Sequence, residues 1–215
     1  MRVGVLGSGQ VGQALARGFA DRGHDVMLGS RDPRKPEVAG WLAEHGDGIA
    51  AGTFAETASH GDLVVVAVLG AAVEEAIGQA DPRSLAGKVV IDATNPLDFS
   101  AGFPPGLIWA QTDSGGERAQ RAAPDAKVVK AFNIIGNAYF VQPRFGDERP
   151  TMMLAGNDAD AKATVGQIVE DFGWPPAIDV GGIEASRELE ALCILWVRIG
   201  GVRGTFDHGF KLLTA

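Results

Sequence analysis

Short apolar segments alternate along the chain with longer segments in which apolar residues recur every three or four positions. The short segments are typical of buried strands and the longer ones of helices with one apolar face. We expect strands at 2–6, 25–28, 49–51, 63–68, 88–92, 127–131, 151–155 and 177–179. We expect helices at 36–44, 55–59, 71–79, 116–123 and 159–172, and from 186 to the end with a break near 200–204. Residues 98–111 are interpreted as an irregular loop.

A glycine-rich motif lies between the first predicted strand and a helix. The motif is Gly7-Ser8-Gly9-Gln10-Val11-Gly12. In a dinucleotide site the first glycine allows a tight turn, the second lets the backbone approach a pyrophosphate, and the third lets the helix pack closely on the sheet. Together with the alternating elements, the motif predicts an α/β fold of Rossmann type, with a doubly wound, mostly parallel sheet and a small C-terminal helical extension.

The end of the second predicted strand indicates which dinucleotide binds. An NAD site has Asp or Glu there to accept hydrogen bonds from the ribose hydroxyls. This chain has Ser30 and Arg31, with Arg34 and Lys35 close behind. A hydroxyl and cations suit a 2′-phosphate, which arginine can hold through two parallel bonds. The sequence therefore favours NADP(H), and a solvated turn whose charge is incidental is the alternative.

Composition limits the size of the fold and its partners. The 215 residues can bury a sizeable core, and we expect a nucleotide-binding domain over 1–183 followed by a helical segment over 184–215. A net charge of −8 argues against nucleic acid and anionic membranes as partners. We expect the partners to be small-molecule substrates and a second copy of the chain.

The single cysteine and the apolar segments indicate the compartment. Cys193 excludes an internal disulfide, which fits a reducing cytoplasm, and its apolar neighbours predict a buried structural thiol. The N-terminus enters a strand at once, so we expect no signal peptide. The longest apolar stretch, 189–202, is interrupted by Arg198 and is too short to span a bilayer.

Several segments resemble one known family over nearly the whole chain. They are the opening MRVGVLGSGQVGQALARGFADRGHDVMLGSRDP and then VVVAV, VVIDATNPL, VVKAFNIIG, TMMLAGND, ASRELEALCILWVRIG and GFKLL. The chain resembles the NADPH-dependent reductases of the deazaflavin coenzyme F420. It is also similar to the cytosolic oxidoreductase domain of the STEAP metalloreductases, which carry a membrane domain as well.

The resemblance implies an extended cofactor site. It assigns the pyrophosphate loop to residues 8–11, within the motif, and the 2′-phosphate site to Ser30, Arg31 and Lys35. Further cofactor-binding positions that the resemblance implies are Val68, Leu69, Gly70, Ala131, Phe132, Asn133 and Ile135, and we also expect Val73, Asn95 and Pro96 to contribute. Family members often have a proline followed by a bulky aromatic residue where this chain has Leu69-Gly70, so we expect a more open wall there.

Some candidate residues have two interpretations. Asn95-Pro96 either faces the nicotinamide or forms only a turn, and Asn133 either donates to the second substrate or caps its own loop. His24, His45 and His60 are interpreted as solvated helix ends. His208 lies where the family closes its second-substrate pocket, although direct contact is the less favoured interpretation.

The motifs contain no set of groups typical of nucleophilic or metal catalysis. We expect no catalytic side chain and no metal, because hydride transfer between two rings needs contact and the exclusion of water. A hydroxy acid or imine substrate would need a proton donor, and Lys130 is the only cation near the predicted carboxamide segment. The expected function is hydride transfer between NADP(H) and a deazaflavin-type acceptor. Alternatives are a flavin, quinone or ferric-chelate reductase, a β-hydroxyacid-type dehydrogenase, and an NADPH-sensing module.

The predicted C-terminal helix is apolar on most of its faces. Leu189, Leu192, Cys193, Trp196 and Ile199 recur at helical spacing, with further apolar residues between them. One sheet covers only one side of such a helix, so we expect a homodimer that covers another. The alternative is that Phe206, Phe210, Leu212 and Leu213 fold back over the helix within one chain.

Overall fold

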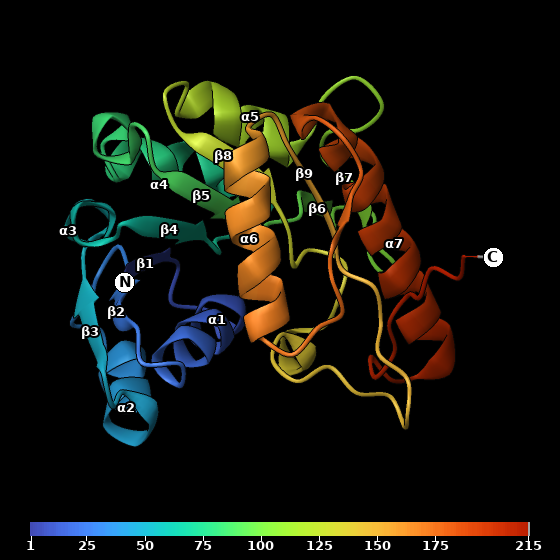
Figure 1. The fold of residues 1–215 in the computed structure, drawn as a ribbon, viewed down its shortest axis with the longest axis horizontal. Coiled ribbons are helices and arrows are strands. Elements are labelled where there is room, and N and C mark those ends of the chain that lie inside the picture. The colour runs from blue at the N-terminus through green and yellow to red at the C-terminus, as the bar shows by residue number, and fades with distance from the viewer. Residues whose placement is uncertain (215) are drawn as a thin grey trace.

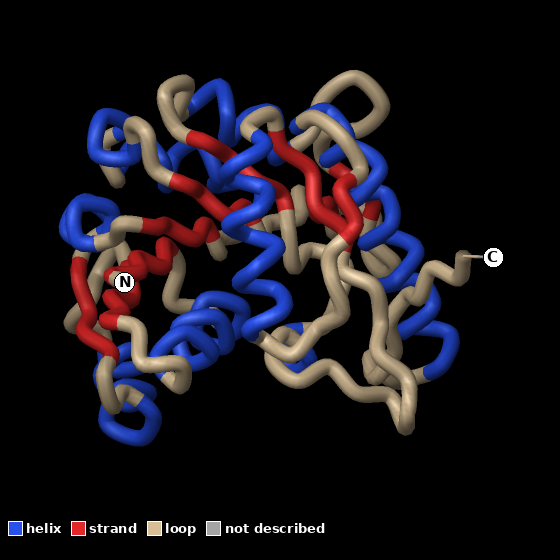
Figure 2. Tube along the Cα trace, viewed as in Figure 1, coloured by secondary structure: helices blue, strands red, loops and turns tan. Residues whose placement is uncertain are grey.

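The computed structural model describes residues 1–214, in which one sheet runs through the whole molecule (Figures 1 and 2). The strands follow the order β10-β9-β8-β5-β4-β1-β2-β3. Every neighbouring pair is parallel except β8 and β9, which are antiparallel. Their bounds are β1 Arg2–Leu6, β2 Asp25–Gly29, β3 Ile49–Gly52, β4 Leu63–Val66, β5 Val89–Asp92, β8 Lys127–Lys130, β9 Met153–Gly156 and β10 Ile178–Asp179. The predicted doubly wound, mostly parallel sheet is confirmed.

Helices cover both faces of this sheet. The helices are α1 Gln10–Ala20, α2 Pro36–His45, α3 Phe54–His60, α4 Val73–Gln79, α5 Gly115–Ala122, α6 Ala159–Asp171 and α7 Ser186–Arg203. Side chains of α1 and α6 share one buried cluster with one face of the strands, while α3, α4 and α5 share a second cluster with the other face. The central strand β4 is buried at every position, as its continuous run of Leu and Val predicts.

Two predicted segments differ from the structure. The stretch 98–111 is not wholly irregular, because β6 Leu97–Asp98 and β7 Gly106–Leu107 pair as a small antiparallel sheet. The predicted C-terminal helix also does not resume after its break. Helix α7 ends at Arg203, the following Gly204 has a left-handed φ of +69°, and residues 205–214 run without helix. Glycine tolerates this conformation and therefore ends the helix.

The C-terminal segment 205–214 is held against the rest of the chain by hydrogen bonds. The amide of Thr151 donates to the carbonyl of Phe210 (2.8 Å), and the amide of Leu212 donates to the Thr151 hydroxyl (3.0 Å). Helix α7 itself lies at the β9 end of the molecule, on the right of Figure 1. No helix among the described residues is long and apolar enough to cross a membrane.

The strand order reverses between β1 and β4. The chain proceeds outward from β1 through β2 to β3, and then returns to β4 on the other side of β1. In open α/β sheets a crevice forms at this point, outside the carboxyl ends of the strands. The glycine-rich motif leaves the carboxyl end of β1 there, so the topology places it at the expected ligand crevice.

Candidate functional site

The glycine-rich loop has the backbone geometry that its sequence predicts. Gly7 has a φ of +126°, and a Cβ there would lie 2.3 Å from the carbonyl oxygen of Ala67. A Cβ on Gly12 would lie 1.8 Å from the carbonyl oxygen of Gly7, so only glycine lets α1 begin so close to the loop. A Cβ on Gly9 would meet nothing within 4 Å. Gly9 therefore faces open space, as required of a backbone that a pyrophosphate approaches.

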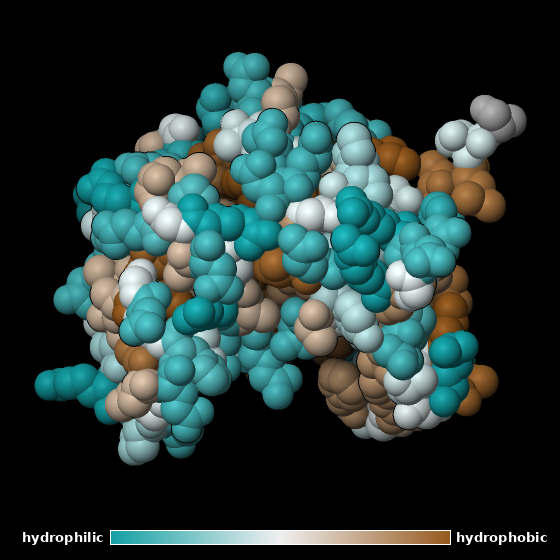
Figure 3. All heavy atoms as spheres, turned by 60° about the horizontal axis from the view of Figure 1, so that its bottom comes forward, coloured by the Kyte–Doolittle hydropathy of each residue, from teal (hydrophilic) through white to brown (hydrophobic). Residues whose placement is uncertain are grey.

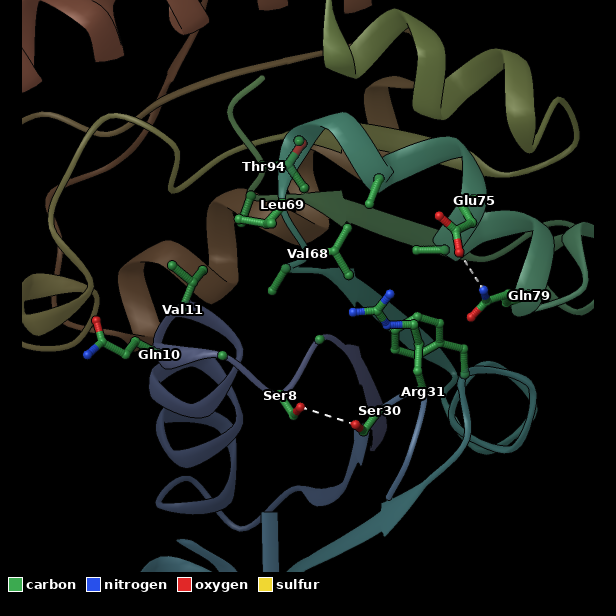
Figure 4. A pocket seen from close by; sticks show the side chains of 18 of the residues that line it. Ser8, Gln10, Val11, Ser30, Arg31, Val68, Leu69, Glu75, Gln79 and Thr94 are labelled. Carbon is green, nitrogen blue, oxygen red and sulfur yellow. Dashed lines mark hydrogen bonds between the residues drawn. The ribbon is translucent and has the colours of Figure 1, made fainter. Parts of the chain in front are cut away.

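The loop opens onto a cavity of about 560 Å³ at the strand reversal (Figure 4). This volume falls in the usual range for a small-molecule site. The structure brings twelve of the predicted cofactor residues together in its lining, namely Gly7, Ser8, Gly9, Gln10, Val11, Ser30, Arg31, Lys35, Val68, Leu69, Gly70 and Asn95. These residues come from the ends of β1, β2, β4 and β5, which lie side by side in the sheet.

The end of the cavity beside β2 carries positive charge and hydroxyls. The Ser8 hydroxyl donates a hydrogen bond to the Ser30 hydroxyl at 3.3 Å, and the backbone amide of Ser30 donates a hydrogen bond to the carbonyl of Gly52. Arg31 extends into the cavity from the end of β2 (Figure 4). With Lys35 also in the lining, hydroxyls and cations converge as a phosphate monoester requires.

The opposite end of the cavity lies at the carboxyl ends of β4 and β5. A Cβ on Gly70 would lie 2.3 Å from both the carbonyl carbon and the oxygen of Asn95, so glycine is required by this close approach. The preceding Leu69 projects into the open, with 83% of its surface exposed. The wall at Leu69-Gly70 is therefore open, and its shape is fixed by the backbone of Asn95.

Two asparagines bridge the neighbouring strand ends. The Asn95 side chain donates to the carbonyl of Asn133 (2.8 Å), and the Asn133 side chain donates both to Asn95 Oδ1 and to the carbonyl of Leu189 (3.0 Å each). Both amide protons of Asn133 are thus used within the chain. Of the two interpretations of this residue, an internal structural bond is the one the geometry supports.

The other predicted residues lie behind the cavity or beside it. Phe132 adopts a left-handed φ of +63°, which turns the chain sharply after β8 and brings Asn133 back to Asn95. Such strained residues concentrate at functional sites. Residues outside the cavity lining are Gly12, Val73, Pro96, Ala131, Phe132, Asn133 and Ile135. The first two belong to the close-packed start of α1 and to the core, respectively.

Several residues of the cavity lining were not predicted from the sequence. They are Phe54, Ala67, Ala72, Glu75, Ala76, Gln79, Ala93, Thr94 and Leu97. Some are direct neighbours of predicted positions, and extending each predicted strand end by one residue would have found them. Glu75 and Gln79 are different, because their spacing of four residues aligns them on one face of α4, where they hydrogen-bond at 2.8 Å (Figure 4). Only the packing of α4 across the cavity brings that face to the site.

Lys130 does not reach the cavity. Its side chain is completely buried, and its ammonium donates to Asp92 (3.0 Å), to the carbonyl of Thr94 (2.6 Å) and to Glu190 (2.7 Å). Desolvation opposes this charge, but the attraction of Asp92 and Glu190 outweighs it and raises the pKa of Lys130. Desolvation also raises the pKa of Glu190. Lys130 is therefore a firmly charged structural cation rather than a free proton donor.

The remaining candidates lie away from the cavity lining. Burial raises the pKa of the Cys193 thiol to about 12, which fits the predicted structural role. His208 stacks on Trp196 with ring centroids 5.0 Å apart, and the two residues exchange bonds with each other's backbone carbonyls. His45 ends α2 with an exposed side chain, as predicted. His60 also ends a helix, but its side chain is only 16% exposed, and His24 lies four residues beyond the end of α1 rather than at it. Among residues 1–214, no group of three His, Cys, Asp or Glu side chains is arranged to hold a metal.

Comparisons with known proteins agree with this geometry. The family model described as NADP oxidoreductase, coenzyme F420-dependent, matches residues 2–96. An F420-dependent NADP reductase of Methanothermobacter marburgensis is 30% identical over 93% of this chain and 92% of its own length. A crystal structure from an Arthrobacter species, provisionally assigned as an F420-dependent NADP-reductase, superposes on all of this chain with a TM-score of 0.95 and 40% identity.

A second group of relatives is longer than this chain. The metalloreductase STEAP3 of Rattus norvegicus is 31% identical over 89% of this chain, which spans only 36% of that protein. Imine reductase and reductive aminase structures are 16–21% identical, with TM-scores of 0.62–0.66, so they share only the fold. The similarity to the Methanothermobacter reductase extends over nearly the full length of both chains, and the cavity beside the glycine-rich loop is lined by Ser30 and Arg31. The chain therefore belongs to the coenzyme F420-dependent NADP oxidoreductase family and is an NADP-dependent oxidoreductase.

Proposed function

We propose that the chain transfers hydride between the nicotinamide of NADP(H) and a deazaflavin-type acceptor. The observation that carries this proposal is the distribution of charged side chains along the cavity lining. Its charged lining residues are Arg31, Lys35 and Glu75, and the carboxyl end of β5 contributes Ala93, Thr94 and Asn95. The lining therefore offers cations for a phosphate but no ionised group at the β5 end.

The arrangement of strands supports an extended dinucleotide. Arg31 follows β2 and Asn95 follows β5, and β1 and β4 lie between these two strands. Three strand spacings of about 4.8 Å separate the two ends by roughly 14 Å. The adenosine 2′-phosphate would lie at Ser30 and Arg31, the pyrophosphate at Gly9 and the start of α1, and the nicotinamide beside Leu69 and Asn95. The bound nicotinamide would supply the hydride chemistry, and the chain would orient the two rings and exclude water.

The absence of a placed proton donor favours a ring acceptor over a hydroxy acid or imine. Reduction of a carbonyl or imine needs an acid close to the nicotinamide. No His, Cys or Lys other than Lys35 appears among the described residues that line the cavity, and the Lys130 ammonium is fully engaged with Asp92, Thr94 and Glu190. A deazaflavin takes the hydride directly on a ring carbon and can take its proton from water.

The similarity to STEAP3 supports a second candidate, namely reduction of a flavin, quinone or ferric chelate. The discriminating experiment mixes the protein with NADPH and each acceptor in turn and follows the nicotinamide absorbance. Oxidation with the deazaflavin at a kcat/KM well above that of the other acceptors is expected. Preference for a flavin or ferric chelate would establish the second candidate. If none of the acceptors supported NADPH oxidation, the protein would be an NADPH-sensing module.

We further propose that the protein is a cytoplasmic homodimer built on α7 and the C-terminal segment 205–214. Apolar side chains are exposed along this part of the molecule, namely Leu195 (47%), Val202 (86%), Phe206 (45%), Leu212 (49%) and Leu213 (78%). Figure 3 shows apolar surface on the same side of the molecule, where α7 and this segment lie. A twofold partner is the commonest cover for such a surface.

The fold-back alternative accounts for only part of this surface. Phe206 and His208 pack on Trp196 within the chain, but Leu212 and Leu213 remain exposed rather than covering α7. Trp196 is therefore partly covered by its own chain. The apolar residues left for a partner are Leu195, Val202, Leu212 and Leu213.

A further inference from the structure

Three ionisable side chains lie completely buried against one another behind the cavity. Asp92 and Lys130 are 0% exposed and Glu190 is 1% exposed. We name these three residues the buried triad. Asp92 and Lys130 are the last residues of β5 and β8, and Glu190 comes from α7.

Every charged atom of the Lys130 and Glu190 side chains has a partner. The three acceptors of the Lys130 ammonium, Asp92, Thr94 and Glu190, account for its three protons. Glu190 also accepts from the first two amides of α5, those of Gly115 (3.1 Å) and Gly116 (3.2 Å). The triad thus fastens α7, the start of α5 and two strand ends at one point.

Hydrogen bonds connect the buried triad directly to the cavity wall. The carbonyl that Lys130 holds belongs to Thr94, and the amide of Thr94 donates to Asp92 Oδ1 (2.9 Å). Thr94 and the next residue, Asn95, both line the cavity. Asn95 is held in turn by Asn133, whose side chain donates to the carbonyl of Leu189, the residue before Glu190 on α7.

Stability does not explain why three charges are buried here. Taking charged side chains out of water can cost as much free energy as their mutual attraction returns. Apolar side chains of similar size are often at least as stabilising in the same place. What an ionic cluster does offer is a single fixed geometry, because each partner must occupy its hydrogen-bonding position. The fixed element here is the segment Thr94–Asn95.

We propose that the buried triad is a positioning element for the nicotinamide half of the cavity, with Glu190 transmitting the position of α7 to the backbone of Thr94 and Asn95. This inference rests on the proposed function in that it takes NADP(H) as the occupant. The adenosine half, at Ser30 and Arg31, is three strands away from the β5 end and does not depend on the triad. The two halves of the ligand should therefore respond differently when the triad is altered.

The test compares intact NADPH with 2′,5′-ADP, a fragment that carries the 2′-phosphate and lacks the nicotinamide. In Glu190→Gln, an NH2 group replaces one carboxylate oxygen, so either the bond from Gly115 or the bonds from Lys130 and Gly116 are lost. Lys130 also loses one of its two anionic partners, so the Thr94 segment loses its fixed position. We expect NADPH affinity to fall by about tenfold, while the affinity for 2′,5′-ADP stays within about twofold of wild type. Calorimetry measures both, and the fluorescence of bound NADPH should shift toward that of the free nucleotide.

Arg187→Met is the matched control. Arg187 also ties α7 to α5, through two bonds to Glu117, but these residues are partly exposed and lie outside both the cavity lining and the triad. This variant should lose stability without changing the affinity for either ligand. A loss of NADPH affinity equal to that of Glu190→Gln would mean that any weakening of α7 disturbs the site, which would overturn the positioning role of the triad.

A second variant serves where Glu190→Gln does not fold. The triple variant Asp92→Asn, Lys130→Met, Glu190→Gln leaves no unpaired buried charge and should still bind 2′,5′-ADP normally while binding NADPH weakly. Wild-type NADPH affinity in either variant, or an equal loss for both ligands, would overturn the inference. A failure of the proposed function would look different, because wild-type protein would bind NADPH and yet reduce no deazaflavin.

Discussion

Arg31 is the residue on which the choice between NADP(H) and NAD(H) depends. It is the one cation that directly follows β2 beside the Ser8–Ser30 hydrogen bond, in the place where NAD enzymes have an acidic residue. A charge-assisted contact to the 2′-phosphate contributes about 1.5–3 kcal/mol. Arg31→Ala should therefore weaken NADPH binding by roughly tenfold to a hundredfold and leave NADH binding almost unchanged.

Arg34→Ala provides the comparison for this measurement. Arg34 lies on the same turn, and its backbone amide bonds to Asp32, but it does not line the cavity. Calorimetry with NADPH and NADH should show little effect of this variant on either nucleotide. Equal losses for both nucleotides in Arg31→Ala would contradict the assignment of the 2′-phosphate site.

Gly9 tests whether the loop binds the pyrophosphate. Its φ of −80° suits any residue, and nothing lies within 4 Å of the position of a Cβ, so the fold should tolerate a side chain there. In Gly9→Val, the branched side chain would occupy the space that the pyrophosphate needs. NADPH affinity should fall by more than about a hundredfold, with an unchanged melting temperature. Normal affinity by calorimetry would refute this assignment of the loop.

At the scale of elements, α7 carries a thiol that the fold keeps inert. The pKa of Cys193 is raised by burial from 9.0 to about 12, so almost none of it is thiolate near neutral pH. The native protein should resist iodoacetamide at pH 8, and the same protein in denaturant should react at the rate of a free thiol. Rapid labelling of the native protein, followed by mass spectrometry, would show that α7 opens readily.

The same shift predicts how stability depends on pH. Between pH 9 and 12 the unfolded thiol loses its proton while the folded thiol keeps it. The unfolded state then binds fewer protons, so the contribution of Cys193 to the free energy of unfolding falls as the pH rises through this range.

Most elements could be predicted because their signals are local. The glycine motif, the apolar strands and the charged turn after β2 each depend on neighbouring residues, and they lie as expected. The small β6–β7 sheet could not be predicted from periodicity, because two residues are too few to show alternation. The break near Gly204 was expected, but the apolar residues beyond it wrongly suggested that the helix resumes.

Only some of the site residues could likewise be predicted from the sequence. Residues directly after strands were found, since carboxyl ends of parallel strands meet at one edge of the sheet. Glu75 and Gln79 were missed because their part in the cavity depends on how α4 packs. Lys130 was weighed as a proton donor, but its buried partners Asp92 and Glu190 are 38 and 60 residues away, and no local pattern reveals such a cluster.

At the scale of the whole molecule, the exposed apolar side chains of α7 define a test of the dimer. Trp196 is a poor choice for it, because Phe206 and His208 cover that side chain within the chain. Val202 is better, since 86% of its surface is exposed. Light scattering of the wild type should give twice 22.4 kDa at micromolar concentration, and Val202→Glu should shift the mass toward 22.4 kDa.

The control for this change is another exposed valine. Val180, beside β10, is 37% exposed and lies outside α7 and the C-terminal segment, so Val180→Glu should leave the mass unchanged. A wild-type mass of 22.4 kDa at micromolar concentration would refute the dimer.

The contact between Gly70 and the backbone of Asn95 limits how this enzyme can be re-engineered or can diverge. A designer seeking another acceptor preference would first introduce at positions 69 and 70 the proline and aromatic residue that the family resemblance indicates there. Any side chain at position 70 would meet the carbonyl carbon of Asn95 at 2.3 Å, so the graft alone would displace the end of β5. A route between the two kinds of wall must change both strand ends together, or pass through variants with a damaged site.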